Sequence, residues 1–241
     1  MNEVRGNVIV GQSGGPTAVI NSSLAGVYKT ARDRGAKKVY GMLHGIQGLL
    51  QERYVDLSEH IKNDLDIELL KRTPSAYLGS CRFKLPEISE DRAIYDRIFE
   101  ILDGLEVEYF FYIGGNDSMD TIKKLSDYAL LNGSKIRFMG VPKTIDNDIF
   151  GTDMTFGFQS AVEIATNAID CIHTTATSHG RVFIVEIMGH KVGSLTLHAG
   201  LAGGADIILI PEIPYDIKKV TEAIQKRNKA GKRFTILAVA E

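Results

Sequence analysis

The sequence predicts an α/β protein in which helices cover mostly parallel sheets. Short runs rich in β-branched or aromatic residues alternate along the chain with longer amphipathic stretches. The short runs have the length of strands, and the longer stretches have the length of helices. This alternation is typical of βαβ units, whose parallel strands require helical crossovers.

Each element is predicted from its own pattern. Strands are expected where apolar runs are short, at residues 8–10, 38–42, 109–113, 137–141, 182–187, 207–210 and 234–238. Helices are expected where apolar residues recur every three or four positions, at residues 17–34, 90–105, 118–132, 160–177, 193–202 and 217–230. Thr17 or Asn21 is expected to help initiate the first helix.

Composition excludes several classes of protein. The 241 residues are 44% hydrophobic and 24% charged, as in an ordinary soluble globular protein, and the net charge is -2. We therefore expect no nucleic-acid partner and no membrane partner. Cys81 and Cys171 are far apart, so neither a disulfide framework nor a zinc site is indicated. The N-terminal residues lack an apolar signal-peptide core, so we expect a cytoplasmic enzyme or binding protein.

The strand and helix pattern pauses at residues 149–153, where apolar and polar residues mix. We place a domain boundary just after this pause, giving domains 1–158 and 159–241. The last strand runs up to Glu241. Because ligand-binding loops follow the carboxyl ends of parallel strands, we expect a functional loop beyond Glu241.

Two glycine-rich turns link a strand to a helix. In residues 11–17, Gly14 and Gly15 would let backbone N–H groups approach an anion, although a simple tight turn explains them equally well. In residues 112–120, Asn116 and Asp117 offer oxygen ligands for Mg²⁺. Helix capping by Asp117 or Ser118 is the alternative explanation for that second turn.

The most specific motif is residues 140–148, which follow an apolar strand. Asp146 and Asp148 are close enough for one to accept a proton while the other orients it or holds a metal. Lys143 would offset their charge or hold a phosphate. The alternative is a solvated turn rich in Asp and Asn.

Other basic residues have ordinary explanations as well as functional ones. Arg181 begins a strand whose far end is Met188, so the two share a pocket only if another subunit supplies one of them. A surface ion pair is the usual explanation for such an arginine, and a surface position for His190. Residues 71–72 and 75–84 add positive charge suited to a phosphate, or form a solvated loop. We assign no role to the remaining histidines, including His44.

Six motifs, in this order along the chain, resemble the phosphofructokinase family: residues 13–15, 78–82, 114–118, 142–148, 188–189 and 210–212. The resemblance implies two Rossmann-like lobes, with the substrate site in the cleft between them. Residues 1–158 would form the phosphoryl-donor lobe and residues 159–241 the fructose 6-phosphate lobe, both incomplete. The family continues past the strand that ends at Glu241, so we expect an N-terminal fragment that folds yet lacks activity.

The implied reaction is transfer of a phosphoryl group to the 1-hydroxyl of fructose 6-phosphate with Mg²⁺, a step of glycolysis. In the ATP-dependent members that this chain resembles, glycine stands at the position of Asp117 and usually also at the position of Lys143. This pair is similar to the pyrophosphate-dependent branch, and we expect the reaction to be reversible. Alternatives are an ATP-dependent enzyme, a non-catalytic sugar-phosphate-binding subunit of the same fold, or an unrelated α/β ligand-binding protein.

The resemblance also implies a role for each matching residue. Asp146 would be the base, with Thr144 and Asp148 beside it and Lys143 near the transferred group. Donor contacts would come from Gly14, Gly15, Arg82, Gly115, Asp117, Ser118 and Lys143. The metal would lie at Asn116 and Asp117, although the family usually has an acidic residue in place of Asn116. The sugar phosphate would contact Thr144, Asp146, Arg181, Met188, Gly189, His190 and Glu212. His190 stands where an arginine is common, and Arg181 would reach a neighbouring subunit's sugar, which implies a homodimer or homotetramer.

Overall fold

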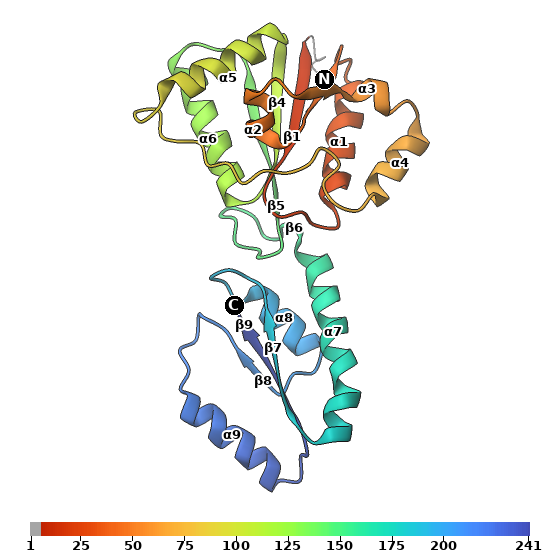
Figure 1. The fold of residues 1–241 in the computed structure, drawn as a ribbon, viewed down its shortest axis with the longest axis vertical. Coiled ribbons are helices and arrows are strands. Elements are labelled where there is room, and N and C mark those ends of the chain that lie inside the picture. The colour runs from red at the N-terminus through yellow and green to blue at the C-terminus, as the bar shows by residue number, and fades with distance from the viewer. Residues whose placement is uncertain (1–5) are drawn as a thin grey trace. The chain divides into compact units, whose positions relative to one another are not determined.

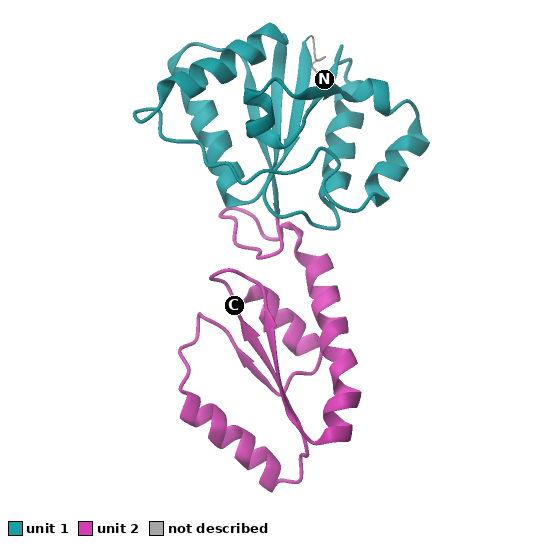
Figure 2. Ribbon diagram, in the orientation of Figure 1, with its two compact units in different colours: residues 1–143 teal, residues 144–241 magenta. Residues whose placement is uncertain are grey.

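A computed structural model describes residues 6–241. The chain divides into two compact units, one ending at Lys143 and the other comprising Thr144–Glu241 (Figure 2). This division falls earlier in the chain than the boundary predicted after Phe158. The α/β class is confirmed, because both units contain parallel strands with helices packed on them.

The first unit is built on β1 (Asn7–Gln12), β2 (Val39–Met42), β3 (Tyr54–Asp56), β4 (Val107–Gly114) and β5 (Arg137–Thr144). These strands lie in the order β3-β2-β1-β4-β5, and only the pairing of β2 with β3 is antiparallel among the described strands of this unit. Its helices are α1 (Ile20–Asp33), α2 (Gly45–Leu50), α3 (Leu57–His60), α4 (Asp64–Arg72), α5 (Arg92–Gly104) and α6 (Asn116–Leu131). Figure 1 shows them on both faces of the sheet.

Alternation along β1 explains the two layers. Val8 and Val10 face a core with α1, α3 and α4, whereas Ile9 faces a core with α2, α5 and α6. The centres of both cores are inaccessible to solvent, since Ile9 and Val10 have no exposed surface. A strand buried on both faces reads as a continuous apolar run, which is why the sequence predicts it well.

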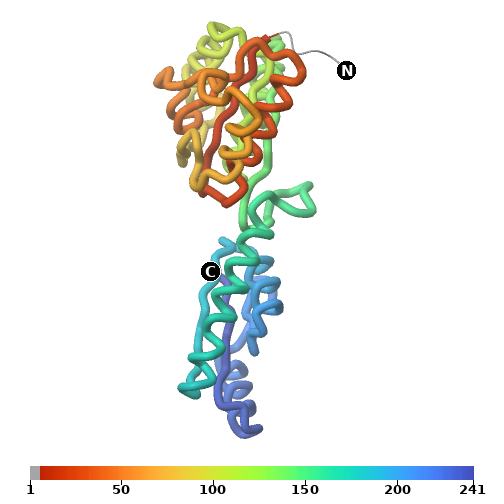
Figure 3. The backbone as a smooth tube through the Cα atoms, turned by 90° about the vertical axis from the view of Figure 1, so that its right-hand side faces the viewer, coloured from red at the N-terminus to blue at the C-terminus, as the bar shows by residue number. Residues whose placement is uncertain are grey.

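The second unit contains β6 (Phe156–Gly157), α7 (Phe158–His179), β7 (Val182–Ile187), α8 (Ser194–Ala202), β8 (Ile207–Leu209), α9 (Ile217–Lys229) and β9 (Thr235–Ala240). Strands β7, β9 and β8 form a parallel sheet in that order. A third core joins α7 and α8 to this sheet through Ile169, Leu195 and Ile236. Figure 3 shows α7 running beside the sheet.

All seven predicted strands and six predicted helices are present, with ends shifted by a few residues. The sequence analysis missed β3, β6 and the helices α2, α3 and α4, all of nine residues or fewer. The expectation for the start of α1 was wrong. The helix begins at Ile20, and the Asn21 side chain is buried, where it binds Gln12 and the carbonyls of Thr73 and Ser75.

Candidate active site

The glycine loop after β1 is held from two sides within the first unit. The Gly14 N–H donates to the Cys81 carbonyl at 3.1 Å, and the Ser80 hydroxyl donates to the Gly14 carbonyl. Gly14 has a φ of +74°, which favours glycine. The Gly14 amide predicted to face donor phosphates is therefore hydrogen-bonded to Cys81 in this structure, and the phosphate contact stays a prediction.

Lys143 lies next to this loop and is only 3% exposed. Its amine donates to the Gly15 carbonyl. A Cβ at Gly14 would lie 3.6 Å from the Lys143 Nζ, and a Cβ at Gly115 would lie 3.6 Å from the Lys143 carbonyl oxygen. The structure thus brings one cation and two glycine turns together, and their contact with a phosphoryl donor stays a prediction.

The turn from β4 into α6 shows that capping does not explain its polar residues. The N-cap position is Gly115, so Asp117 and Ser118 lie inside the first turn of the helix, and the capping explanation is wrong. The Ser118 hydroxyl instead forms a hydrogen bond with the Ser13 hydroxyl. A Cβ at Gly114 would lie 2.0 Å from that Ser118 Oγ, so the close approach requires glycine.

Asn116 and Asp117 are both exposed at the N-terminal turn of α6. Within residues 6–241, three or more His, Cys, Asp or Glu side chains nowhere converge as a metal cluster. Mg²⁺ at phosphoryl-transfer sites takes only one or two protein carboxylates, and substrate phosphates and water complete its shell. One carboxylate beside one amide oxygen therefore fits a magnesium ion that arrives with the donor.

In the second unit, Thr144 and Asp146 are bonded to each other. The Thr144 hydroxyl donates to Asp146 Oδ2 at 3.2 Å and accepts from the Asp146 N–H at 3.1 Å. Burial raises the pKa of the Asp146 carboxyl, and the nearby negative charge of Asp148 raises it further. The hydrogen bond from Thr144 acts in the opposite direction. Asp146 is thus a partly buried, hydrogen-bonded carboxylate rather than a fully exposed one.

The loop after Asp146 is pinned by Asn147, whose φ is +56°. Its amide oxygen accepts from the Thr155 N–H at 2.9 Å, and its amide nitrogen donates to the Asp153 carbonyl at 3.3 Å. The turn thus has fixed partners and Asp146 is partly buried, and the explanation as a turn rich in Asp and Asn stays open beside the functional one.

Glu241 belongs near Asp146, although the sequence analysis did not assign it a role. Its negative charge contributes to the raised pKa of Asp146, and its N–H donates to the Ile187 carbonyl at 3.0 Å. Strands β7 and β9 are parallel, so Glu241 lies at the same sheet edge as Met188 and Gly189. The available signal was that Glu241 directly follows an apolar strand.

His190 also acts on Asp146, since its positive charge would lower that pKa. Glu212, by contrast, supports the loop before α8: its Oε1 accepts from the Gly193 N–H at 2.8 Å. A Cβ at Gly193 would lie 2.6 Å from Glu212 Oε2, so this pair is tightly packed. A contact between Glu212 and the sugar stays a prediction.

The two arginines are placed differently within their own units. Arg181 is exposed and precedes β7, while Met188 follows the opposite end of that strand. Six residues of strand span about 20 Å, so one chain does not bring Arg181 and Met188 together. Arg82 is exposed and directly follows Cys81, whose carbonyl binds Gly14.

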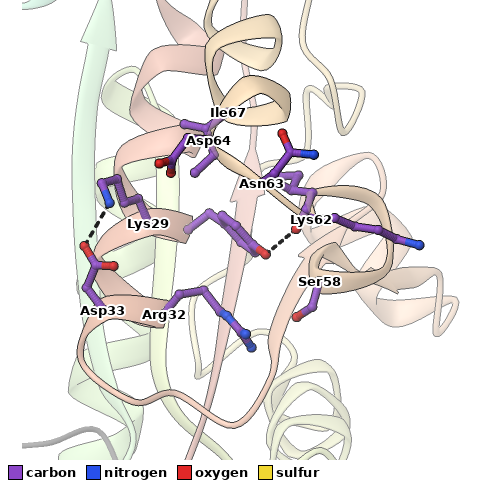
Figure 4. Close-up of a pocket in the computed structure, with 10 residues that line it drawn as sticks. Lys29, Arg32, Asp33, Ser58, Lys62, Asn63, Asp64 and Ile67 are labelled. Atoms are coloured by element: carbon purple, nitrogen blue, oxygen red, sulfur yellow. Dashed lines mark hydrogen bonds and ion pairs between the residues drawn. The ribbon is translucent and has the colours of Figure 1, made fainter.

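Two cavities of the first unit lie away from all these residues. One, of about 320 Å³, is shown in Figure 4 and lies between α1 and the segment from α3 to α4. There Lys29 pairs with Asp33 at 3.2 Å, and the Tyr28 hydroxyl donates to the Ile61 carbonyl. The other, of about 640 Å³, is lined by residues of α5, the start of β4, the end of α6 and the segment 132–136 that follows α6. Neither contains a predicted site residue. Among residues 6–241, no helix combines the length and the apolar character needed to cross a membrane.

Comparison with known proteins agrees with this geometry. A family profile described as Phosphofructokinase matches residues 7–241. An ATP-dependent 6-phosphofructokinase of Spirochaeta thermophila is 40% identical over 236 residues, covering 95% of this chain and 62% of the relative. A pyrophosphate--fructose 6-phosphate 1-phosphotransferase of Xanthomonas campestris is 42% identical, covering 92% of this chain and 55% of the relative.

Among solved structures, a pyrophosphate-dependent phosphofructokinase from Nitrosospira multiformis superposes with a TM-score of 0.87 at 34% identity. The match covers 98% of this chain and 60% of that one. The chain therefore spans about 60% of the length of the proteins that it resembles. The match to the family profile extends over nearly all of the described residues, so the chain belongs to the phosphofructokinase family.

Proposed function

We propose that the protein is a pyrophosphate-dependent 6-phosphofructokinase. It transfers a phosphoryl group from pyrophosphate to the 1-hydroxyl of fructose 6-phosphate. The products are fructose 1,6-bisphosphate, a glycolytic intermediate of the cytoplasm, and inorganic phosphate, which leaves as the P–O bond of pyrophosphate breaks. The observation that carries the proposal is the buried amine of Lys143, bonded to Gly15 and close to Gly14. A buried cation beside a glycine loop suits a compact, highly charged phosphoryl donor.

The choice of donor rests on Lys143 and Asp117. Relatives with both kinds of donor are similarly identical to this chain, so overall identity does not separate them. The Asp117 carboxylate is exposed in the first turn of α6, where its charge and size oppose the α-phosphate of a nucleotide. Pyrophosphate has no such additional phosphate, and Lys143 supplies it with a cation.

Asp146 is the proposed base. Its raised pKa makes the carboxylate a stronger proton acceptor than an ordinary aspartate, and Thr144 fixes the orientation of one carboxylate oxygen. Asp146 takes the proton from the sugar 1-hydroxyl as that oxygen attacks phosphorus. Asp148 contributes through its charge, which raises the basicity of Asp146.

Charge that develops on the transferred group needs nearby positive charge. Lys143 and Arg82 provide this positive charge. On the donor side, backbone N–H groups would come from two turns, which contain Gly14, Gly15, Gly115 and Ser118. Mg²⁺, held by Asn116, Asp117 and the donor's own oxygens, would supply further neutralisation. Only Thr144 and Ile145 separate Lys143 from Asp146 in the chain, so one short segment carries both the cation and the base.

The sugar phosphate is proposed to bind at the carboxyl ends of β7 and β8. Met188, Gly189 and His190 follow β7, and Glu212 supports the loop between them and α8. Arg181 lies at the opposite end of β7, so we assign it to the sugar phosphate of a neighbouring subunit. This assignment requires a homodimer or a homotetramer.

A non-catalytic sugar-phosphate-binding subunit is the second candidate. Asn116 and His190 favour it, because they replace residues that the family usually has at these positions. The intact and partly buried Asp146, with Thr144 bonded to it, favours catalysis instead.

The test is phosphorylation of fructose 6-phosphate by the protein as its gene encodes it, with Mg²⁺ and either pyrophosphate or ATP. Turnover with pyrophosphate alone is the expected result. Turnover with ATP alone would retain the reaction and reject the donor assignment. Fructose 6-phosphate binding without turnover would favour the non-catalytic subunit.

A further inference from the structure

His44 has an unusual backbone conformation and holds a neighbouring segment of the chain. It precedes α2 with a φ of +59°, a region that residues other than glycine seldom adopt. Its N–H donates to the Leu78 carbonyl at 2.8 Å, and its ring Nδ1 lies 3.2 Å from the Ser80 carbonyl oxygen. Because a carbonyl oxygen only accepts, Nδ1 must carry the proton in this contact.

Gly79 lies between these two carbonyls in the chain and is also in contact with His44. Gly79 has a φ of +73°, and a Cβ there would lie 2.6 Å from the His44 Cε1 atom. The imidazole ring therefore packs directly on the Gly79 backbone. His44 thus contacts three consecutive residues of the segment 78–82.

That segment is in turn bound to the glycine loop. The Ser80 hydroxyl donates to the Gly14 carbonyl, and the Cys81 carbonyl accepts from the Gly14 N–H at 3.1 Å. Arg82 comes next in the chain. The two carbonyls that His44 contacts, those of Leu78 and Ser80, therefore lie four and two residues before Arg82 in the chain.

We propose that His44 is a positioning residue for phosphoryl-donor binding, which sets the segment 78–82 so that this segment holds the Gly14 loop in place and Arg82 faces the donor. This inference rests on the proposed function, since it assigns the donor to these residues. His44 does not itself contact the reacting atoms. Its effect is expected on the donor and not on the sugar.

The first experiment compares His44→Ala with His44→Asn in the full protein. Loss of the ring hydrogen bond in His44→Ala is expected to raise the KM for pyrophosphate roughly two- to tenfold, the range for one hydrogen bond. The KM for fructose 6-phosphate should not change. Asparagine tolerates positive φ and offers an amide N–H near the Nδ1 position, so His44→Asn should restore donor binding. His60→Ala, at an exposed histidine ending α3, is the matched control.

A second measurement does not depend on turnover. Amide hydrogen exchange of Gly14, followed by NMR, should accelerate in His44→Ala and return toward the wild-type rate in His44→Asn. If the wild-type protein uses neither donor, the proposed function fails, and this exchange rate alone decides whether His44 positions the loop. Unchanged exchange and donor KM in His44→Ala, equal effects on both substrates, or failure of asparagine to restore them would overturn the inference.

Discussion

The side-chain amine of Lys143 donates a hydrogen bond to the backbone carbonyl of Gly15, 128 residues away in the chain. The contact links the carboxyl end of β5 to the loop after β1, although β4 lies between these two strands. A buried lysine is costly unless its amine has polar partners. The position of this amine is therefore fixed by the sheet, and its charge is held beside the loop proposed to bind the donor.

Donor preference should change when the two residues that oppose ATP are replaced by glycine. Asp117→Gly with Lys143→Gly removes a negative side chain and a buried cation. We expect the kcat/KM ratio of pyrophosphate to ATP to fall about tenfold or more, since a hydrogen bond to a charged group contributes about 1.5–3 kcal/mol.

Asp117→Gly alone is the control, because the exposed Asp117 leaves no cavity. Thermal unfolding of both variants separates a change of donor from loss of fold. A double variant that folds and keeps the wild-type ratio would reject the steric and charge argument.

Removal of the proposed base should strongly reduce turnover while the protein still binds its substrates. Asp146→Asn keeps the shape of the side chain but cannot accept the sugar proton, so kcat should fall by about 10²- to 10⁴-fold. Asp153→Asn, an exposed carboxylate in the same loop, is the matched control and should leave kcat near that of the wild type. Equal falls of kcat in the two variants would mean that a change in the loop, and not the loss of proton transfer, lowers the rate.

The raised pKa of Asp146 makes a prediction about pH. The carboxyl must lose its proton to act as a base, so kcat/KM should rise with pH through a value above the ordinary aspartate pKa of about 4. Asp148→Asn removes a neighbouring negative charge, so the rise of kcat/KM should occur at lower pH in this variant. If kcat/KM of Asp148→Asn rises at the same pH as that of the wild type, another group controls the pH dependence.

The same shift has a consequence for stability. Because the folded state raises the pKa of Asp146, the native protein binds this proton more tightly than the unfolded chain. This contribution is complete below the unfolded pKa and is lost as pH rises through the folded pKa. Asp146→Asn should therefore be more stable than the wild type at neutral pH, and chemical denaturation at several pH values measures the difference.

Two adjacent glycines should differ sharply in their tolerance of alanine. A Cβ at Gly114 would lie 2.0 Å from Ser118 Oγ and 2.6 Å from Ser13 Oγ, so Gly114→Ala should destabilise the fold by about 1–3 kcal/mol. At Gly115 the nearest group is the Lys143 carbonyl oxygen at 3.6 Å. Gly115→Ala should stay within about 1 kcal/mol of the wild type in urea unfolding. Similar midpoints for the two variants would contradict the packing at this turn.

The main elements of the fold could be predicted from the sequence because their apolar residues are continuous or periodic. Strand β4 and helix α5 are examples, buried through Phe110, Tyr112, Ile98 and Leu102. The segment from α2 to α4 was missed because its elements are short and β3 is an antiparallel edge strand. One signal was available there: Asn63 and Asp66 form a capping box that opens α4.

The candidate site could be predicted only in part. Strand ends identified Gly14, Lys143 and Asp146, because ligand-binding loops follow parallel strands. Contacts across the sheet could not be predicted, since they depend on which strands become neighbours. The bond between Ser13 and Ser118 is one such contact, and helix capping was the local alternative that it displaced. The influence of Glu241 on Asp146 depends likewise on the parallel pairing of β7 with β9.

Asn147 separates the two carboxylates of its motif and has a different kind of function from either of them. Its positive φ and its bonds to Thr155 and Asp153 shape the loop without any part in proton transfer. Replacing both aspartates should therefore leave the shape of this loop unchanged as long as Asn147 is retained. In a related sequence, an asparagine kept here between two neutral residues would indicate that the loop retains its shape independently of the two carboxylates.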